Sequence, residues 1–427
     1  MTFDIFPFSE DALTKLLGNN FRSRYLINYL KEIGAKTCIL EKNYIDKDYI
    51  IDYQKFYARS FEEYGKFTKR VHFFASELSR GEFEQALEKN RVNEIQESYL
   101  GFIVVRPIKS STGDPLIGRT ILKTYPVEEG ADRRYFVTEK YCASLFGIPL
   151  EVNSLPFQEQ DQGVSACATI ALWSALNPLH SKFGIFRHSP AEITEVATSF
   201  PSPSRAFPTT GLILDQMINY IRSISLDVEV IRALDNDIIT TAVKAYVQAG
   251  FPIIAILKLE STTESSMHAA VISGYRSGPI REVKELYVHD DQIGPYCRVK
   301  PCGDFRVWKN EWIELGYNIT LEKLLIPIYP KIRLTFSRIY AYYQKLNERV
   351  SSIENLDLSL ELNLASIQSY KKFLLQNDIK NKINVLTKPM PRFLWIIRMW
   401  LGDSILVDNI FDGVSTYPKL LTKIFYK

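Results

Sequence analysis

Apolar and polar residues follow both helical and strand periods in the first third of the chain. Helices are expected over residues 21–33, 49–64 and 82–91. Strands are expected over residues 36–40 and 99–107, and a proline closes the second of them. The second helix carries a stripe of aromatic side chains, which is more typical of a core than of a binding surface. This mixture predicts an N-terminal α+β region that spans residues 1–145.

The pattern changes after residue 145, where an extended stretch leads to an apolar, alanine-rich helix that begins at Cys167. A loop rich in serine and proline follows, and Thr209 or Thr210 is expected to cap the next helix. Asp235 is expected to cap another helix, which ends at Gly250. Strands are then expected over residues 252–259, 268–275 and 283–290. A cysteine helix followed by an antiparallel sheet predicts an α+β domain over residues 146–328.

The last hundred residues begin a fresh series of elements. Helices are expected over residues 332–350 and 366–376, and a hairpin over residues 393–411. Leucines alternate strictly with polar residues from Leu356 to Leu364, which is typical of a half-buried strand. We expect a smaller C-terminal α/β module over residues 329–427. It should be separable, supply no catalytic residue, and dock on the preceding domain or on a partner protein.

The composition argues against several classes of protein. Lysine and arginine total 52 against 49 for aspartate and glutamate, so the net charge of +3 gives no electrostatic basis for binding nucleic acid. No uninterrupted apolar run reaches about 18 residues, so no membrane span is expected. The first residues lack the basic and apolar regions of a signal peptide. Five cysteines form no disulfide framework, and we therefore expect a cytoplasmic protein.

One cysteine has the surroundings of a nucleophile. Cys167 follows a polar turn rich in glutamine and glycine, and it opens the apolar helix. The N-terminal end of a helix carries partial positive charge, which favours a thiolate over a thiol. A cysteine in such a place is also often a small buried hydrophobe. The other residues of the segment and of the following strands therefore decide between the two interpretations.

Those strands supply a base and an acid. His268 begins one predicted strand, and Asp290 and Asp291 end the next. A thiol hydrolase needs a base that takes the thiol proton and a carboxylate that orients the base, a role that either aspartate can fill. The side chain of Gln162, five residues before Cys167, can donate to the oxyanion of a tetrahedral intermediate. Gln160 is the alternative donor.

Two segments carry a resemblance to a known superfamily. Asp-Gln-Gly-Val-Ser-Ala-Cys-Ala, followed by an alanine-rich helix, resembles the nucleophile segment of papain-like cysteine peptidases, and His-Ala-Ala-Val-Ile-Ser-Gly-Tyr is similar to their histidine strand. The bacterial peptidases that cleave double-glycine leader peptides are the nearer likeness, because their third member is an aspartate at a strand end. Phytochelatin synthase shares the general arrangement. The resemblance covers approximately residues 155–298.

Carried onto this chain, the resemblance implies that Cys167 is the nucleophile, His268 the base, Asp290 the orienting acid and Gln162 the oxyanion donor. The chain departs from the pattern in three places, the first being an interval from Gln162 to Cys167 that is one residue shorter than in papain itself. Ala168 follows the cysteine where glycine or tryptophan is usual, and about a hundred residues separate cysteine from histidine, fewer than the roughly 130–150 of papain and cathepsins. A compact bacterial variant is therefore favoured.

The resemblance implies a papain-like core within an α+β chain. The expected activity is hydrolysis of a peptide or isopeptide bond in a protein or peptide, through a thioester and with no metal or other cofactor. The narrow cleft of this class favours a protein tail that ends in small residues. Acyl transfer on the same triad and a catalytically inactive binding module are alternatives. A metal site of His289, Asp290, Asp291 and Cys297 is a further alternative, although the cysteines lack zinc-type spacing.

Overall fold

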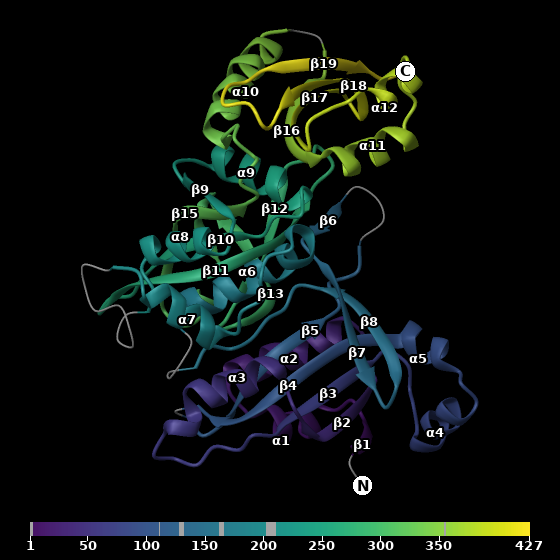
Figure 1. Ribbon diagram of the computed structural model, residues 1–427, viewed down its shortest axis with the longest axis vertical. Coiled ribbons are helices and arrows are strands. Elements are labelled where there is room, and N and C mark those ends of the chain that lie inside the picture. Colours follow the sequence, from purple (N-terminus) through teal and green to yellow (C-terminus); the bar gives the residue numbers. More distant parts are fainter. Residues whose placement is uncertain (1–2, 111, 128–131, 162–165, 202–210, 354–355) are drawn as a thin grey trace.

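Antiparallel sheets organise the chain, and Figure 1 shows them following one another along its long axis. The computed structural model describes residues 3–110, 112–127, 132–161, 166–201, 211–353 and 356–427. Helices and strands are both abundant, so the fold class is α+β. Within the described ranges, no helix has the length and apolar character needed to cross a membrane.

The N-terminal region is built on a five-stranded sheet in the order β1-β2-β3-β4-β5. Its strands are β1 (Phe3–Pro7), β2 (Thr37–Tyr44), β3 (Thr68–Phe74), β4 (Tyr99–Lys109) and β5 (Pro115–Leu122). The accompanying helices are α1 (Glu10–Leu17), α2 (Phe21–Glu32), α3 (Lys47–Lys55), a short 3-10 turn at Tyr57–Arg59, α4 (Arg80–Glu88) and α5 (Val92–Ser98).

Both faces of this sheet are covered, because side chains along a strand point alternately to its two sides. Ile103 and Val105 of β4 share a core with α1, α2 and the central part of the molecule. Phe102 and Val104 belong instead to a second core. This second core is completed by α4, α5 and the hairpin of β7 (Glu139–Leu145) and β8 (Ile148–Ser154).

The central sheet has eight strands, seven in the order β10-β11-β12-β13-β14-β15-β9 and β6 paired to β11. Because β10 also pairs with β15, the strands β10 to β15 close on themselves. Its strands are β6 (Arg133–Phe136), β9 (Asp227–Arg232), β10 (Ile253–Glu260), β11 (Ser265–Ser277), β12 (Val283–Asp290), β13 (Gly294–Cys302), β14 (Asp304–Lys309) and β15 (Asn318–Ile328). Four helices accompany the sheet: α6 (Cys167–Phe183), α7 (Pro190–Thr198), α8 (Leu214–Ser223) and α9 (Asn236–Gln248).

The chain crosses into the central sheet earlier than expected. β6 lies before the expected boundary at residues 145 and 146, yet it pairs with β11, with Phe136 opposite Gly274. Gly274 has a backbone reason to be glycine, because an added Cβ would lie 2.4 Å from the Tyr135 carbonyl oxygen. The expected boundary also falls inside the hairpin of β7 and β8. The N-terminal region and the central sheet are therefore interlocked rather than joined by one linker.

The C-terminal module is a four-stranded sheet with helices. Its elements are α10 (Phe336–Ser351), β16 (Leu358–Ser366), α11 (Ile367–Gln376), α12 (Lys382–Thr387), β17 (Phe393–Leu401), β18 (Ser404–Asp412) and β19 (Leu420–Phe425). Leu362 and Leu364 of β16 are buried in the same core as α9. The expectation that the leucine face docks on the preceding domain is therefore confirmed, whereas its separability stays a prediction.

Most predicted elements are present, with shifted ends. The aromatic helix expected over 49–64 is shorter, because α3 ends at Lys55 and a 3-10 turn follows. Asp235 caps α9 as predicted, accepting a hydrogen bond from the backbone N–H of Ile238. Thr209 and Thr210 lie outside the described residues. The position before α8 is held by Ile213, which makes no side-chain capping bond, so the expected cap is not there.

Candidate active site

Cys167 is the first residue of α6, and the backbone places it at the mouth of a pocket. Ala166 precedes it in an extended conformation (φ −82°, ψ 170°) and offers no capping side chain. The first-turn N–H groups, which carry the positive end of the helix dipole, therefore lack a side-chain cap there. From Ala168 to Leu179 the helix is buried, which anchors it, while Cys167 itself is partly exposed. A cysteine on a fixed helix end next to open space is accessible to a substrate.

His268 faces the same pocket from β11. The pocket has a volume of about 850 Å³, and both Cys167 and His268 line it. The His268 side chain is almost fully buried, and its Nε2 atom lies 3.1 Å from Oδ1 of Asp290 at the end of β12. The predicted cysteine, histidine and aspartate are thus brought together by α6, β11 and β12.

Asp290 is held by two further donors. The indole Nε1 of Trp312 donates to its Oδ2 at 2.8 Å, and the backbone N–H of Gln292 donates to its Oδ1 at 3.0 Å. The Trp312 ring also stands edge-on to the His268 ring, with 5.5 Å between centroids. Trp312 therefore shields the ion pair from water and fixes its acid. Sequence reasoning missed this residue, since it lies in a short 3-10 turn without a motif.

His268 and Asp290 each shift the pKa of the other toward its charged form. Burial alone would lower the pKa of His268, but the Asp290 carboxylate and the Cys167 side chain outweigh it, and the pKa is raised well above its ordinary value. Burial alone would raise the pKa of Asp290, yet His268, Trp312 and the Gln292 N–H hold it below its ordinary value. Both shifts favour an imidazolium next to a carboxylate, the state that also stabilises a thiolate.

Asp291 lies close to the pair but has a different environment. Its Oδ1 is 3.7 Å from Nε2 of His268, and neither of its oxygens has a hydrogen-bond partner among the described residues. Burial raises the pKa of Asp291 to about 7, against the opposing effect of His268. Asp290, which is closer and better held, is therefore the orienting acid of the two candidates.

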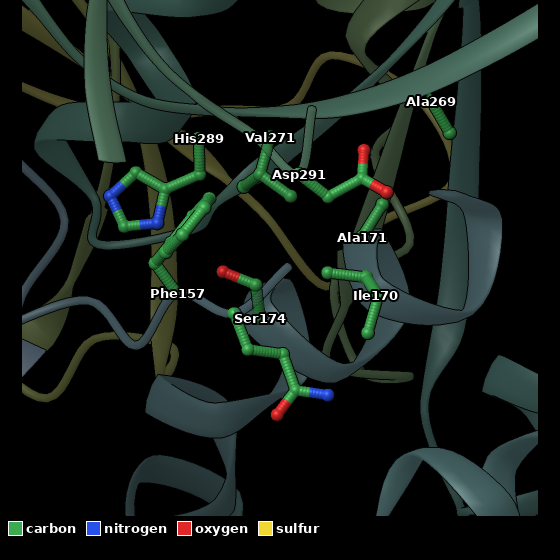
Figure 2. Close-up of a pocket in the computed structure, with 9 residues that line it drawn as sticks. Phe157, Ile170, Ala171, Ser174, Ala269, Val271, His289 and Asp291 are labelled. Atoms are coloured by element: carbon green, nitrogen blue, oxygen red, sulfur yellow. The ribbon is translucent and has the colours of Figure 1, made fainter. Parts of the chain in front are cut away.

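A small cavity lies behind the triad, and Figure 2 shows the residues that line it. The His289 ring and Phe157 lie on one side, and the Asp291 carboxylate lies near Ala171 of α6 on the other. Its volume of about 10 Å³ matches the space of one water molecule. Burial lowers the pKa of His289 to about 3, so this imidazole is neutral at physiological pH. The cavity is polar on both sides but too small for a substrate.

Ion pairs and a hydrogen bond hold the segment before Cys167 against the N-terminal region. Arg106 of β4 forms an ion pair with Asp161 at 3.1 Å, and it also donates to the Glu159 carbonyl. Arg22 of α2 contacts the Glu159 carboxylate at 2.9 Å. Both side chains of the first pair are only 2% exposed. These contacts fix the backbone on which Gln160 stands.

Of the two candidate oxyanion donors, only one lies among the described residues. Gln160 lines the pocket beside Cys167. Gln162 lies outside the described residues, so the structure does not place it. Gln160 therefore stays a candidate donor, and the expectation that Gln162 takes this role stays a prediction.

A metal site would have to use the same atoms. Among the described residues, the one cluster of potential metal ligands is His268, Asp290 and Asp291, whose ligand atoms lie within 4.8 Å of one another. The site expected from His289, Asp290, Asp291 and Cys297 is not assembled, because His289 and Cys297 fall outside this cluster. Cys297 is buried and its thiol donates to the Gly294 carbonyl. Since His268 Nε2 already lies 3.1 Å from Asp290 Oδ1, the donor set fits a triad better than a metal.

Comparisons with known proteins add no family to this description. No family model matches the chain, and no curated protein matches it significantly.

Proposed function

We propose that this protein is a papain-like thiol hydrolase that cleaves a peptide or isopeptide bond, with Cys167 as nucleophile, His268 as base and Asp290 as orienting acid. One observation carries the proposal: a partly exposed cysteine at a helix start shares a pocket with a buried histidine that is paired to a carboxylate. This combination of nucleophile, base and orienting acid defines triad catalysis independently of fold.

The chemistry follows from the positions. His268 takes the proton of Cys167, and the thiolate sulfur attacks the carbonyl carbon, forming a C–S bond. The oxyanion is stabilised by the backbone N–H of Cys167 and by the side-chain amide of Gln162 or Gln160. His268 then gives its proton to the leaving amine, and a thioester remains. Water, deprotonated by His268, attacks the thioester and releases the acid and the free thiol.

Labelling with iodoacetamide near pH 7 tests the nucleophile. All five cysteines are free, and two of them, Cys142 and Cys302, are exposed without a histidine partner among their described contacts. Cys167 should react faster than these two, although it is less exposed, because only its thiolate is stabilised by an imidazolium. His268→Ala should slow Cys167 to the rate of Cys142. Equal labelling of Cys167 and the exposed cysteines, or its protection, would contradict the proposal.

Probe labelling and turnover distinguish the hydrolase from an inactive binding module and from an acyltransferase. A vinyl sulfone or chloromethyl ketone probe should modify Cys167 in an enzyme and leave a binding module unmodified. An added amine should leave product formation unchanged for a hydrolase and divert the thioester to an amide in a transferase. Asp290→Asn should reduce turnover more than Asp291→Asn, because Asp290 lies closer to Nε2. The five free thiols support a reducing, cytoplasmic setting within this proposal.

A further inference from the structure

The pocket beside Cys167 is much wider than the chemistry alone requires. Its volume of about 850 Å³ lies in the range that takes whole ligand groups. The walls are mainly apolar and come from the segment that begins α8 and from the central sheet: Leu212, Ile213, Leu214, Met217, Ile256 and Met267. Met217 and Ile256 are largely buried, so they form a floor. Such a pocket accepts a large apolar side chain, which a cleft restricted to small residues would not.

A row of side chains crosses the sheet along the pocket, beginning one residue after His268 in the chain. Residues directly opposite each other in antiparallel strands point to the same face. Ala269 of β11, next to His268, pairs with Ile256 of β10, which pairs with Lys323 of β15, which pairs with Arg232 of β9. Ala269, Ile256 and Lys323 all line the pocket beside Cys167, so this row runs along the pocket wall over an apolar side chain to Lys323, and Arg232 continues it.

These cations have no acid of their own in the described part of the chain. Lys323 lines the pocket, and neither it nor Arg232 forms an ion pair with a described carboxylate. Asp161 also lines the pocket, but it is paired with the buried Arg106. A positive charge at the far end of an apolar pocket attracts an acidic group of the ligand.

The separation between the strands determines how far the acidic group of the ligand lies from the cleaved bond. Lys323 stands two strands from Ala269, and neighbouring strands lie about 4.8 Å apart, so the separation is roughly 10 Å. An extended peptide covers about 3.3 Å per residue, which places the acid about two to three residues from the cleaved bond.

We propose that this pocket selects a peptide segment with a large apolar side chain near the cleaved bond and an acidic residue two to three positions away, held by Lys323. The proposal rests on the thiol hydrolase function for its chemistry. Lys323 acts as the specificity-determining residue, and Arg232 extends the positive surface for a second acid.

Cleavage of a peptide library made by digesting a bacterial proteome tests this specificity. Mass spectrometry of the products should show Asp or Glu enriched two to three residues from the cut, beside a large apolar residue. Lys323→Glu should reduce the preference for Glu over Gln by about fivefold, as a partly exposed ion pair implies, and favour Lys and Arg instead. Lys300→Glu makes the same charge change on β13, away from the pocket lining, and should leave the preference intact.

Binding of the same library to the Cys167→Ala protein separates the two proposals. If acidic peptides are captured in a Lys323-dependent way but none is cleaved by the wild type, the ligand class holds and the hydrolase function fails. If the wild type cleaves peptides without acidic enrichment, or with an enrichment that Lys323→Glu leaves unchanged, the hydrolase function holds and this specificity is wrong. If the library is neither cleaved nor bound selectively, both proposals fail.

Discussion

The N-terminal region and the C-terminal module both share a core with the central sheet, but they contact it through different chemistry. The N-terminal region sends Arg106 and Arg22 to Asp161 and Glu159, on the segment that leads to Cys167. The C-terminal module contributes Leu362, Leu364 and Trp395 to a shared apolar core. Neither region supplies a described residue to the pocket lining.

The two regions are therefore expected to affect the active site differently, one by positioning its residues and the other by stabilising the fold. Buried ion pairs are directional, so the N-terminal region fixes the position of Gln160 and Asp161 beside the nucleophile. Apolar contacts are non-directional and scale with buried area, so the C-terminal module contributes mainly to stability. The comparison predicts that loss of the ion pairs to the segment before Cys167 alters turnover, whereas changes in the C-terminal module alter only the folded population.

The largest effect is expected at the centre, where neither region contributes a side chain. Cys167→Ala should reduce turnover by at least about 10⁴-fold, because the nucleophile and His268 act as a unit. The free energy of unfolding should change by less than about 1 kcal/mol, since the side chain is partly exposed and small. Steady-state kinetics and urea unfolding measure the two quantities. A variant that keeps most of its turnover would show that the pocket is not the reaction site.

Arg106→Met tests the directional contact. Removing one partner of a buried ion pair leaves Asp161 uncompensated, which should cost about 3–5 kcal/mol of stability. Turnover should fall by up to about 100-fold in the folded protein, because the segment that carries Gln160 loses its anchor. Adding Asp161→Asn should recover stability but not kcat.

Arg119→Met is the matched control for this change. Arg119 lies on β5 of the same sheet, and its side chain pairs with the buried Asp46 at 2.7 Å rather than with an acid of the segment before Cys167. It should destabilise the protein while leaving kcat unchanged. Equal losses of kcat in the two variants would remove the distinction between positioning and stability.

Trp395→Ala tests the apolar contact of the C-terminal module. The side chain is fully buried, stands edge-on to Tyr246 of α9, and donates its indole N–H to the Leu334 carbonyl. Its removal should cost about 3–5 kcal/mol, measured by urea unfolding. Turnover per folded molecule should be unchanged. Trp400→Ala in the same strand, where the ring is partly exposed beneath Arg281, should cost about 1 kcal/mol or less.

The remaining prediction concerns Asp291 and depends on pH. Its pKa is about 7 when folded and near 4 when unfolded, so between these values the folded state binds more protons. Stability from this group therefore falls as pH rises from about 4 to about 7 and stays low above that range. Asp291→Asn removes the ionisation, so it should stabilise the protein at pH 8 relative to its effect at pH 4. Urea unfolding at both values measures this, and an equal effect at both would contradict the burial argument.

The sequence predicted those features that depend on local signals. Cys167 and Asp290 were found because they stand at the start of α6 and the end of β12, elements with a clear apolar period. His268 was expected to begin its strand but lies three residues inside β11, which begins at Ser265. The order and type of α6, α8, α9 and β10 to β12 followed from the same periods, whereas α7 and β13 to β15 were not predicted. The fold class α+β could be inferred for this reason.

The features that sequence reasoning missed depend on pairing between distant segments. Trp312 reaches Asp290 from a turn, and Lys323 reaches the pocket only through the register of β15 on β10. Arg106 carried a usable signal, because a charge inside the apolar run of β4 must find a buried partner. The partner itself, Asp161, could not be named, since no period links a strand to a turn over fifty residues away.

The pairing of β6 with β11 has a consequence for how the chain is made. β6 leaves the ribosome more than a hundred residues before β11, which begins at Ser265. At about 5–20 residues per second, this strand waits on the order of ten seconds for its partner during translation. The N-terminal region therefore completes its folding only after the strand that carries His268 has been synthesised. Recombination that transplanted the N-terminal region alone would separate β6 from this partner, which favours inheritance of the two regions as one unit.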